Sequence, residues 1–329
     1  MTKPETNMKR RDLIAAAALA PLAASVRAQD KYPSKPIRLI VPFAPGGSSS
    51  IVARAFTGQM SKALGQEIIV DNRPGGAGNI AMEAAAKAEP DGYTLIMGHI
   101  GTLAVNPYMF AKLPFDTNRD FAAVSLLAKV PSIFVVNSTV PVKNLTEMLA
   151  YTKANAGKVY YGSAGNGSAG HLAFEYLKLV TKMEIQHVPY KGTGPQLTDL
   201  IGGQTQASSA GTPPLMPFVK AGKLRVFAVG TAKRLAELPD VATVAEQGYP
   251  GFETVQWYGL IAPAKTPPAI IKRLADEAGK AAKSKETQDA FAGDSTEAVG
   301  SSAQEFADFI KKEQARWSQV VRAAGIKAD

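Results

Sequence analysis

Short apolar runs alternate with amphipathic helical patterns along most of this chain. The run Ile37–Val41 precedes a helical pattern in which Val52 and Phe56 share one face. A later run, Tyr93–Met97, follows a second helical segment. Strands that are joined through a helix usually lie parallel in their sheet. The alternation therefore predicts an α/β fold with mostly parallel sheets flanked by helices, and ligands at the carboxyl ends of the strands.

The same alternation restarts after residue 120 and predicts a second lobe. Two apolar runs, Phe121–Lys129 and Ser132–Asn137, precede a series of strands and helices that extends from Val159 to Val229. A strand predicted at Trp257–Ala262 then returns the chain to the first lobe. We expect lobe 1 to comprise residues 29–130 plus 256–329, and lobe 2 to comprise residues 131–255.

The first 28 residues have the pattern of an export signal. A basic segment, Lys9–Arg11, is followed by an alanine-rich apolar stretch, and Ala28 supplies a small residue at the expected cleavage point. The stretch from Arg10 to Ile14 also resembles a twin-arginine signal, which leaves the export route open. No later segment has 18 uninterrupted apolar residues. We expect a signal peptide cleaved near Ala28 and a mature protein in the periplasm.

Charge and cysteine content exclude several classes of function. The chain contains no cysteine, so disulfides, thiolate metal sites and cysteine nucleophiles are ruled out. Its formal net charge is +9, and no dense Lys/Arg block with interleaved aromatic residues is present. Nucleic acid is therefore not an expected partner. A mild positive excess favours the capture of small anions.

Four glycine-rich turns each follow a predicted strand and precede a predicted helix. They centre near Gly47, Gly78, Gly167 and Gly194. The first N–H groups of a helix have no intrahelical acceptor, and the peptide dipoles place partial positive charge there. Glycine permits close approach of a ligand, and serine hydroxyls can donate. Each turn alone is equally compatible with an ordinary connection, but together they predict a carboxylate site that needs no buried arginine.

Signatures of enzymes are weak. Gly165–Gly170 matches G-x-G-x-x-G and Gly76–Ala81 matches its variant, but neither is followed by an acidic residue at the end of the next strand. Ser163 and Ser168 do not fit the G-x-S-x-G elbow. The three histidines have no metal-ligand spacing, and His171 is compatible with structural packing or with ligand contact. We expect no catalytic residue, no metal and no cofactor.

The glycine-rich turns belong to an ordered set of motifs that resembles a known family. The motifs are Pro42–Ser48, Asn72–Gly78, Pro90–Leu95, Asn106-Pro107, Gly165–Leu172, Val188–Gly192 and Ala221–Arg225. This series, which spans nearly the whole chain after residue 28, resembles the extracytoplasmic receptors of tripartite tricarboxylate transporters, often called Bug receptors.

The resemblance implies a two-lobed, type II periplasmic binding protein with its ligand cleft between the lobes. It implies a di-, tri- or aromatic carboxylate as ligand, the membrane permease subunits of a tripartite transporter as partners, and a monomer. By the same resemblance, the loops at Gly46 to Ser50 and Ser163 to Ser168 contact the carboxylate. The expected ligand-binding residues are Phe43, Gly46, Gly47, Ser48, Ser49, Ser50, Gly78, Thr102, Ser163, Asn166, Gly167, Ser168, His171, Thr193 and Gly194.

One position departs from the family pattern. Members commonly have Gly-Gly-Ser-Thr-Asp at the first loop, where this chain has Ser50 in place of the acid. The loss of an acidic partner for a ligand amine predicts a preference for amine-free carboxylates.

Two other functions remain open at this stage. A sensor subunit that passes a signal to a membrane protein needs the same closing cleft as a transport receptor. An exported cofactor-dependent enzyme is suggested by the twin-arginine-like leader, but the missing fingerprint acid and nucleophile elbow argue against it.

Overall fold

The computed structural model describes residues 32–327, in which ten strands form one mixed sheet. The predicted signal peptide, residues 1–28, lies outside the described residues. The strands are β1 (Ile37–Val41), β2 (Ile68–Asn72), β3 (Thr94–His99), β4 (Phe121–Asn137), β5 (Tyr160–Ser163), β6 (Gln186–Pro189), β7 (Ala207–Gly211), β8 (Leu224–Val229), β9 (Val255–Pro263) and β10 (Glu297–Ala298).

Helices cover the sheet, and from Lys35 onward the described chain forms a single compact unit. They are α2 (Ser48–Leu64), the short η1 (Gly76–Gly78), α3 (Asn79–Ala86), η2 (Gly101–Val105), α4 (Asn106–Met109), α5 (Leu145–Ala154), α6 (Ala169–Thr181), α7 (Thr193–Ile201), α8 (Thr212–Lys220), α9 (Pro268–Lys283), α10 (Lys285–Phe291) and α11 (Ala303–Ala324). The predicted α/β class is confirmed.

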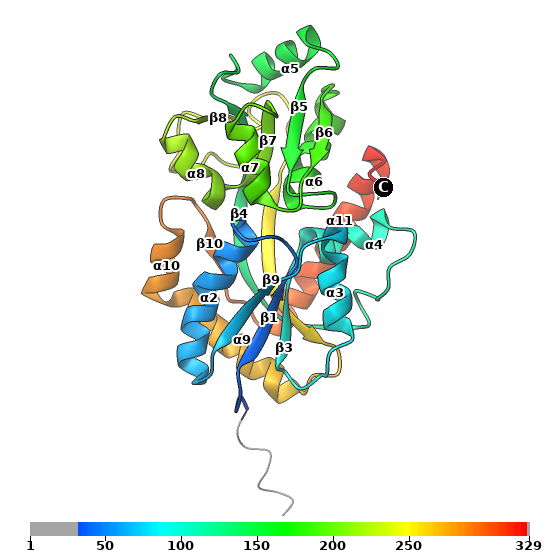
Figure 1. The fold of residues 1–329 in the computed structure, drawn as a ribbon, viewed down its shortest axis with the longest axis vertical. Helices are drawn as coiled ribbons and strands as arrows, with labels where there is room; N and C mark the ends of the chain where they lie inside the picture. Colours follow the sequence, from blue (N-terminus) through cyan, green and yellow to red (C-terminus); the bar gives the residue numbers. More distant parts are fainter. Residues whose placement is uncertain (1–31, 328–329) are drawn as a thin grey trace, which may run out of the picture. The chain divides into compact units, whose positions relative to one another are not determined.

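Two parallel groups of strands are joined by a long antiparallel pair. The strand order is β2-β1-β3-β9-β4-β7-β5-β6, with β8 and β10 also paired to β4. Strands β1, β2 and β3 are parallel to one another, as are β5, β6 and β7. Strand β9 runs antiparallel to both β3 and β4. In Figure 1, β4 and β9 run from the group that contains β1 to the group that contains β7.

The two apolar runs predicted as separate strands are one continuous strand, β4. Its first part pairs with β9 and its second part pairs with β7 and β8. The change of partner falls at Pro131, which lies opposite Val255, and at Ser132, which lies opposite Gly211. Proline has no N–H to give to a ladder, so it is tolerated where one ladder ends and the next begins.

Helix α8 was not predicted, because its sequence contains three prolines. Pro213 and Pro214 lie in the first turn, where a helical N–H has no intrahelical acceptor to lose. Only Pro217 removes an interior hydrogen bond. Prolines that interrupt a helical pattern in sequence therefore mark the start of a helix in the structure.

A shared carboxylate holds the last helix against the sheet. Trp257 of β9 and Trp317 of α11 are both 1% exposed. Their indole nitrogens donate to the same oxygen, Oε2 of Glu313, at 2.8 and 3.3 Å. Phe306 packs edge-on to Trp257 in the same cluster. Glu313 therefore satisfies two buried donors that otherwise have no acceptor in this apolar cluster.

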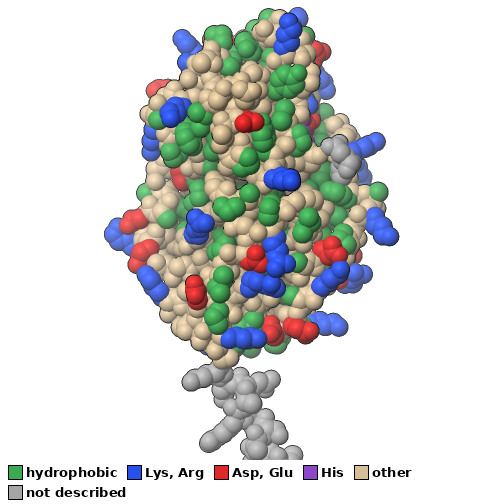
Figure 2. Space-filling view, viewed as in Figure 1, with side chains coloured by type: hydrophobic (Ala, Val, Ile, Leu, Met, Phe, Trp, Pro, Cys, Tyr) green, Lys and Arg blue, Asp and Glu red, His purple; other side chains and the backbone are tan. Residues whose placement is uncertain are grey.

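The surface carries mixed charge. On the face shown in Figure 2, Lys and Arg side chains are interspersed with Asp and Glu, without a continuous basic patch. None of the helices within residues 32–327 has the length and apolar character needed to cross a bilayer.

The role of Glu313 can be tested by substitution. We expect Glu313→Ala to lower the free energy of unfolding by about 2–5 kcal/mol, because it leaves two buried indole N–H groups without an acceptor. Glu313→Gln keeps an acceptor oxygen and should lose clearly less. Urea denaturation measures both values, and equal losses for the two variants would refute this role.

Candidate functional site

Three helices begin at one cavity, which lies beyond the carboxyl ends of the parallel strands. They are α2 from one strand group and α6 and α7 from the other. The cavity has a volume of about 30 Å3. It is lined by Phe43, Ser48, Ser49, His99, Ala164, Ser168, Ala169, Gly170, Thr193, Gln196, Ser209, Ala210, Gln256 and Tyr258.

Backbone N–H groups at two of these helix starts face the cavity without an acceptor. In α2, Ser48 and Ser49 lie in the first turn, so their N–H groups have no intrahelical acceptor, and neither donates to a backbone group outside the helix among residues 32–327. In α6, the same holds for Ala169 and Gly170 within the described chain. All four residues are buried. Buried donors of this kind, at the positive ends of two helix dipoles, favour an anionic ligand.

His99 adds a neutral side-chain donor at the end of β3. Its Nδ1 lies 3.3 Å from the donating N–H of Thr102 and 3.0 Å from the Thr102 hydroxyl, which assigns the ring proton to Nε2. That Nε2 is buried and faces the backbone of Gly167 from the other strand group, which is its one hydrogen-bond partner among the described residues. Burial lowers the pKa of His99 to about 3, while the nearby Gly167 backbone acts in the opposite direction. The ring is therefore uncharged at neutral pH.

Other neutral groups complete the lining. Gln196 Oε1 and Ser209 Oγ are buried and have no partner in the part of the chain that the structure describes. The Tyr258 hydroxyl donates to Gln256 Oε1 at 2.8 Å, and the side chain of Ser48 bonds to Tyr258. Burial raises the pKa of Tyr258 well above 10. No residue that lines the cavity carries a charge at neutral pH, so the site attracts anions through dipoles and hydrogen bonds.

The predicted residues fall into three groups in the structure. Those that line the cavity are Phe43, Ser48, Ser49, Ser168 and Thr193. Gly78 and Asn166 line a neighbouring cavity, together with Phe43. The remaining eight are Gly46, Gly47, Ser50, Thr102, Ser163, Gly167, His171 and Gly194, which lie around the two cavities without lining either. Their direct contact with a ligand stays a prediction.

The four glycines of this third group lie where the loops of the two strand groups meet. A Cβ placed on Gly46 would lie 3.8 Å from the Cα of Gly194. One on Gly47 would lie 2.7 Å from Thr193 Oγ1, and one on Gly167 would lie 2.9 Å from Met109 Cε. Side chains at Gly47 and Gly167 would therefore force the loops apart.

The side chains of the other four hold neighbouring groups. Ser50 Oγ accepts from Asn72 at 3.3 Å and so faces β2. Ser163 Oγ lies 2.7 Å from His187 Nε2, and Thr102 holds the ring of His99. His171 Nδ1 accepts from the N–H of Gly167 at 3.2 Å, which fixes the second loop.

Nine of the lining residues are absent from the ligand-binding residues expected from sequence, namely His99, Ala164, Ala169, Gly170, Gln196, Ser209, Ala210, Gln256 and Tyr258. His99 and Ser209 lie near the ends of predicted strands, which is a weak signal for them. Tyr258 lies in the strand predicted at Trp257–Ala262, a position at least as compatible with core packing as with a cleft. Trp257, its neighbour, is a core residue.

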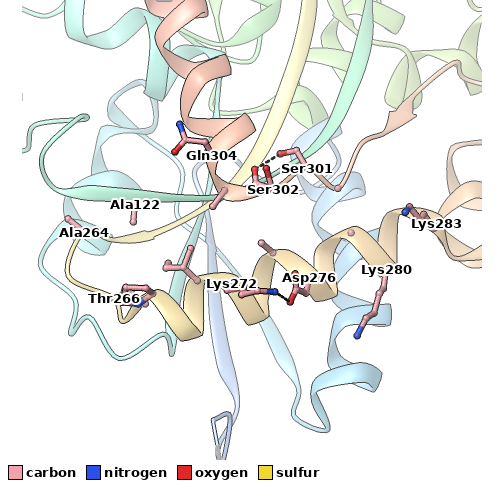
Figure 3. A pocket seen from close by; sticks show the side chains of 16 residues that line it. Ala122, Ala264, Thr266, Lys272, Asp276, Lys280, Lys283, Ser301, Ser302 and Gln304 are labelled. Carbon is pink, nitrogen blue, oxygen red and sulfur yellow. Dashed lines mark hydrogen bonds and ion pairs between the residues drawn. The ribbon is translucent and has the colours of Figure 1, made fainter.

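A larger groove lies elsewhere, between α9 and the start of α11 (Figure 3). Its volume is about 900 Å3, but no glycine-rich turn reaches it. Lys272 pairs with Asp276 at 2.7 Å on the same helix, and Lys280 pairs with Glu277. At the other wall, Ser302 caps α11 together with Glu305. Two of the three lysines that line the groove, together with the start of α11, are thus already paired with groups of the protein.

Comparison with known proteins agrees with this geometry. The sequence profile of the family described as "Tripartite tricarboxylate transporter family receptor" matches residues 52–326. Protein BugT of Bordetella pertussis is 37% identical over 311 residues, which cover 94% of this chain and 95% of that protein.

Solved structures show the same fold. A structure described as a periplasmic transporter is 41% identical, with a TM-score of 0.87 over 91% of this chain and all of that one. R. palustris Rpa4515, solved with adipate, is 35% identical with a TM-score of 0.86, covering 90% and 99% of the two chains. MatC of Rhodopseudomonas palustris, solved with bound malate, is 31% identical with a TM-score of 0.85, covering 88% and 100%.

Fold and site thus define a solute-binding receptor of the periplasmic binding protein type. Within that class, the chain belongs to the tripartite tricarboxylate transporter receptor family, also called the TctC or Bug family.

The buried histidines give stability a defined pH dependence. Burial lowers the pKa of His99 and of His187 to about 3, and neighbouring His171 and Lys178 also lower that of His187. The unfolded chain, with histidine pKa values near 6.5, binds more protons between these values, so stability falls as the pH drops below about 6.5. The loss is at most about 1.4 kcal/mol per pH unit for each histidine.

We therefore expect His99→Gln to show a shallower loss of unfolding free energy than the parent between pH 6.5 and pH 5. Urea denaturation at several pH values measures both slopes. Parallel slopes would show that His99 is not held neutral by burial.

Proposed function

We propose that this protein captures a small carboxylate in the cavity between its two strand groups and delivers it to the permease subunits of a tripartite transporter. The observation that carries the proposal is the set of acceptor-free N–H groups at Ser48, Ser49, Ala169 and Gly170 around a cavity without charged lining. Hydrogen bonds to a charged acceptor contribute about 1.5–3 kcal/mol each, so a few of them support micromolar binding after ordering costs.

The adipate and malate bound to two structural relatives support a carboxylate as the ligand class. Receptors of this kind act by binding, so the proposal includes no catalytic residue, metal or cofactor. It places the mature protein in the periplasm as a monomer, in keeping with the periplasmic description of a relative.

Entry of the ligand requires movement of the two strand groups. A volume of about 30 Å3 holds only a water molecule or two, whereas a dicarboxylate is several times larger. We propose that residues 35–130 with 256–327 move against residues 131–255, and that β4 and β9 provide the hinge. The change of pairing partner within β4, from Val255 of β9 opposite Pro131 to Gly211 of β7 opposite Ser132, supports this position of the hinge.

We further propose that ligands without an amine are preferred. None of the residues that line the cavity is acidic, so an ammonium group would lose its hydration without gaining a carboxylate partner. Ser50, which replaces the usual acid, turns its hydroxyl to Asn72 and does not compensate.

The amide site is tested by placing a carboxylate among the N–H groups. In a thermal-shift assay with mono-, di-, tri- and aromatic carboxylates, the parent should gain about 2.7 kcal/mol at a ligand concentration of 100 times Kd. We expect Gly47→Asp and Gly167→Asp to abolish the shift, because each new side chain repels the ligand and blocks loop contact. The matched control is Gly58→Asp in the same helix α2, where a Cβ meets nothing within 4 Å. Full ligand shifts in both cavity variants would refute the amide site.

The amine preference is tested with succinate and aspartate, which differ by one ammonium group. We expect succinate to stabilise the protein at concentrations at least tenfold below those needed with aspartate. A larger shift with aspartate would contradict the preference and leave the carboxylate site itself intact.

A further inference from the structure

A second cavity, of about 330 Å3, adjoins the amide-lined cavity. The two share Phe43 and Ala164, so these residues form the neck between an inner and an outer compartment. The outer compartment is lined by Phe43, Gly75, Gly76, Ala77, Gly78, Phe110, Ala164, Gly165, Asn166, Pro189, Tyr190 and Lys191.

Three aromatic side chains from different elements line this outer compartment. Phe43 lies edge-on to the ring of His99, with 4.7 Å between ring centroids. The hydroxyl of Tyr190 donates to Asp199 at 2.7 Å, which holds the tyrosine in place. Phe110 and Tyr190 pair with no other ring in the described part of the chain, and both are half-buried. Phe110 also packs against the neighbouring apolar core, so a ligand would contact only those parts of the two rings that line the compartment.

Four glycines contribute backbone without side chains to the lining of this compartment. Gly75, Gly76, Gly78 and Gly165 all have positive φ and carry no side chain. A Cβ on Gly165 would lie 2.7 Å from the carbonyl oxygen of Tyr190, so the loop packs against that strand end through its backbone alone. Exposed peptide planes let a flat ring approach to van der Waals distance, where a branched aliphatic group would leave gaps.

Charge is scarce in the outer compartment. Lys191 is the one charged side chain among its lining residues, and it is exposed. Apolar cavities of about 150 Å3 hold a benzene ring, so about 330 Å3 is ample for a substituted ring.

We propose that the outer compartment holds the aromatic ring of an aromatic carboxylate whose carboxylate group occupies the inner, amide-lined cavity. The proposal rests on the proposed function and names the ligand class of the same site. Phe110 and Tyr190 provide the ring contacts, and Phe43 flanks the bond between ring and carboxylate at the neck. Two aromatic rings in a preferred relative orientation attract each other more strongly than their buried area alone accounts for. A ring ligand should therefore bind more tightly here than an aliphatic group of equal size.

The test is calorimetric titration with matched pairs of ligands on the full mature chain. Benzoate, phenylacetate and 3-phenylpropionate are each compared with the cyclohexyl counterpart of the same length, and propionate and adipate serve as ring-free references. We expect at least one aromatic acid to bind at least tenfold more tightly than its cyclohexyl counterpart and than adipate.

Variants locate the ring. Phe110→Ala should weaken the best aromatic ligand at least tenfold while leaving the affinity for propionate unchanged. Phe110→Leu keeps apolar volume without a ring and should show most of the same loss. Tyr108→Ala, which removes an exposed aromatic side chain nearby in sequence, serves as the matched control and should bind like the parent.

Three outcomes would overturn the proposal. They are equal binding of aromatic and cyclohexyl acids, unchanged aromatic affinity in both Phe110 variants, or tightest binding of adipate with a strong loss in Lys191→Met. In each of these three outcomes the inner site still binds a carboxylate. The result would therefore refute only the role proposed for the outer compartment. Absence of binding by every carboxylate would instead refute the proposed function on which the inference depends.

Discussion

A helix that begins inside a protein leaves its first N–H groups without intrahelical acceptors. The need for acceptors at such helix starts is the physical constraint on which the binding site of this molecule depends. The starts of α2, α6 and α7 are buried at one place, where the described chain supplies no acceptor for the first N–H groups of α2 and α6. Buried donors without partners are costly. A ligand that brings negative charge offsets that cost, so the same feature that burdens the fold provides the binding energy of the receptor.

The two strand groups and their glycine-rich turns were accessible from sequence because they depend on local patterns. Ile37–Val41 and Leu224–Val229 coincide with observed strands, and the turn near Gly47 precedes α2 as expected. The family resemblance was also correct, since the family profile matches residues 52–326 and a family member is 37% identical over 94% of the chain. Local sequence did not predict the elements correctly where proline occurs, because the effect of proline depends on its position in a strand or helix. The two cases are Pro131 in β4 and the prolines in the first turn of α8.

The cavity lining was only partly predictable, because it depends on which strand ends the topology brings together. His99, Gln196 and Tyr258 come from three elements that are far apart in sequence, and none lies in a glycine-rich motif. Conversely, Ser163 and His171 lie in the right loop but hold neighbouring groups, namely His187 and the Gly167 backbone. A loop motif identifies the site, whereas side-chain direction needs the packed structure.

The neutral lining of the cavity has a consequence for uptake from media of different acidity. Its two titratable residues are His99, with a pKa of about 3, and Tyr258, with a pKa well above 10. The cavity lining thus stays uncharged near neutral pH and in mildly acidic media. In that range a change in the charge of the solute is not accompanied by a change in the charge of the lining. Such a receptor would favour the deprotonated fraction of each acid, and weak acids would escape capture as the medium approaches their own pKa.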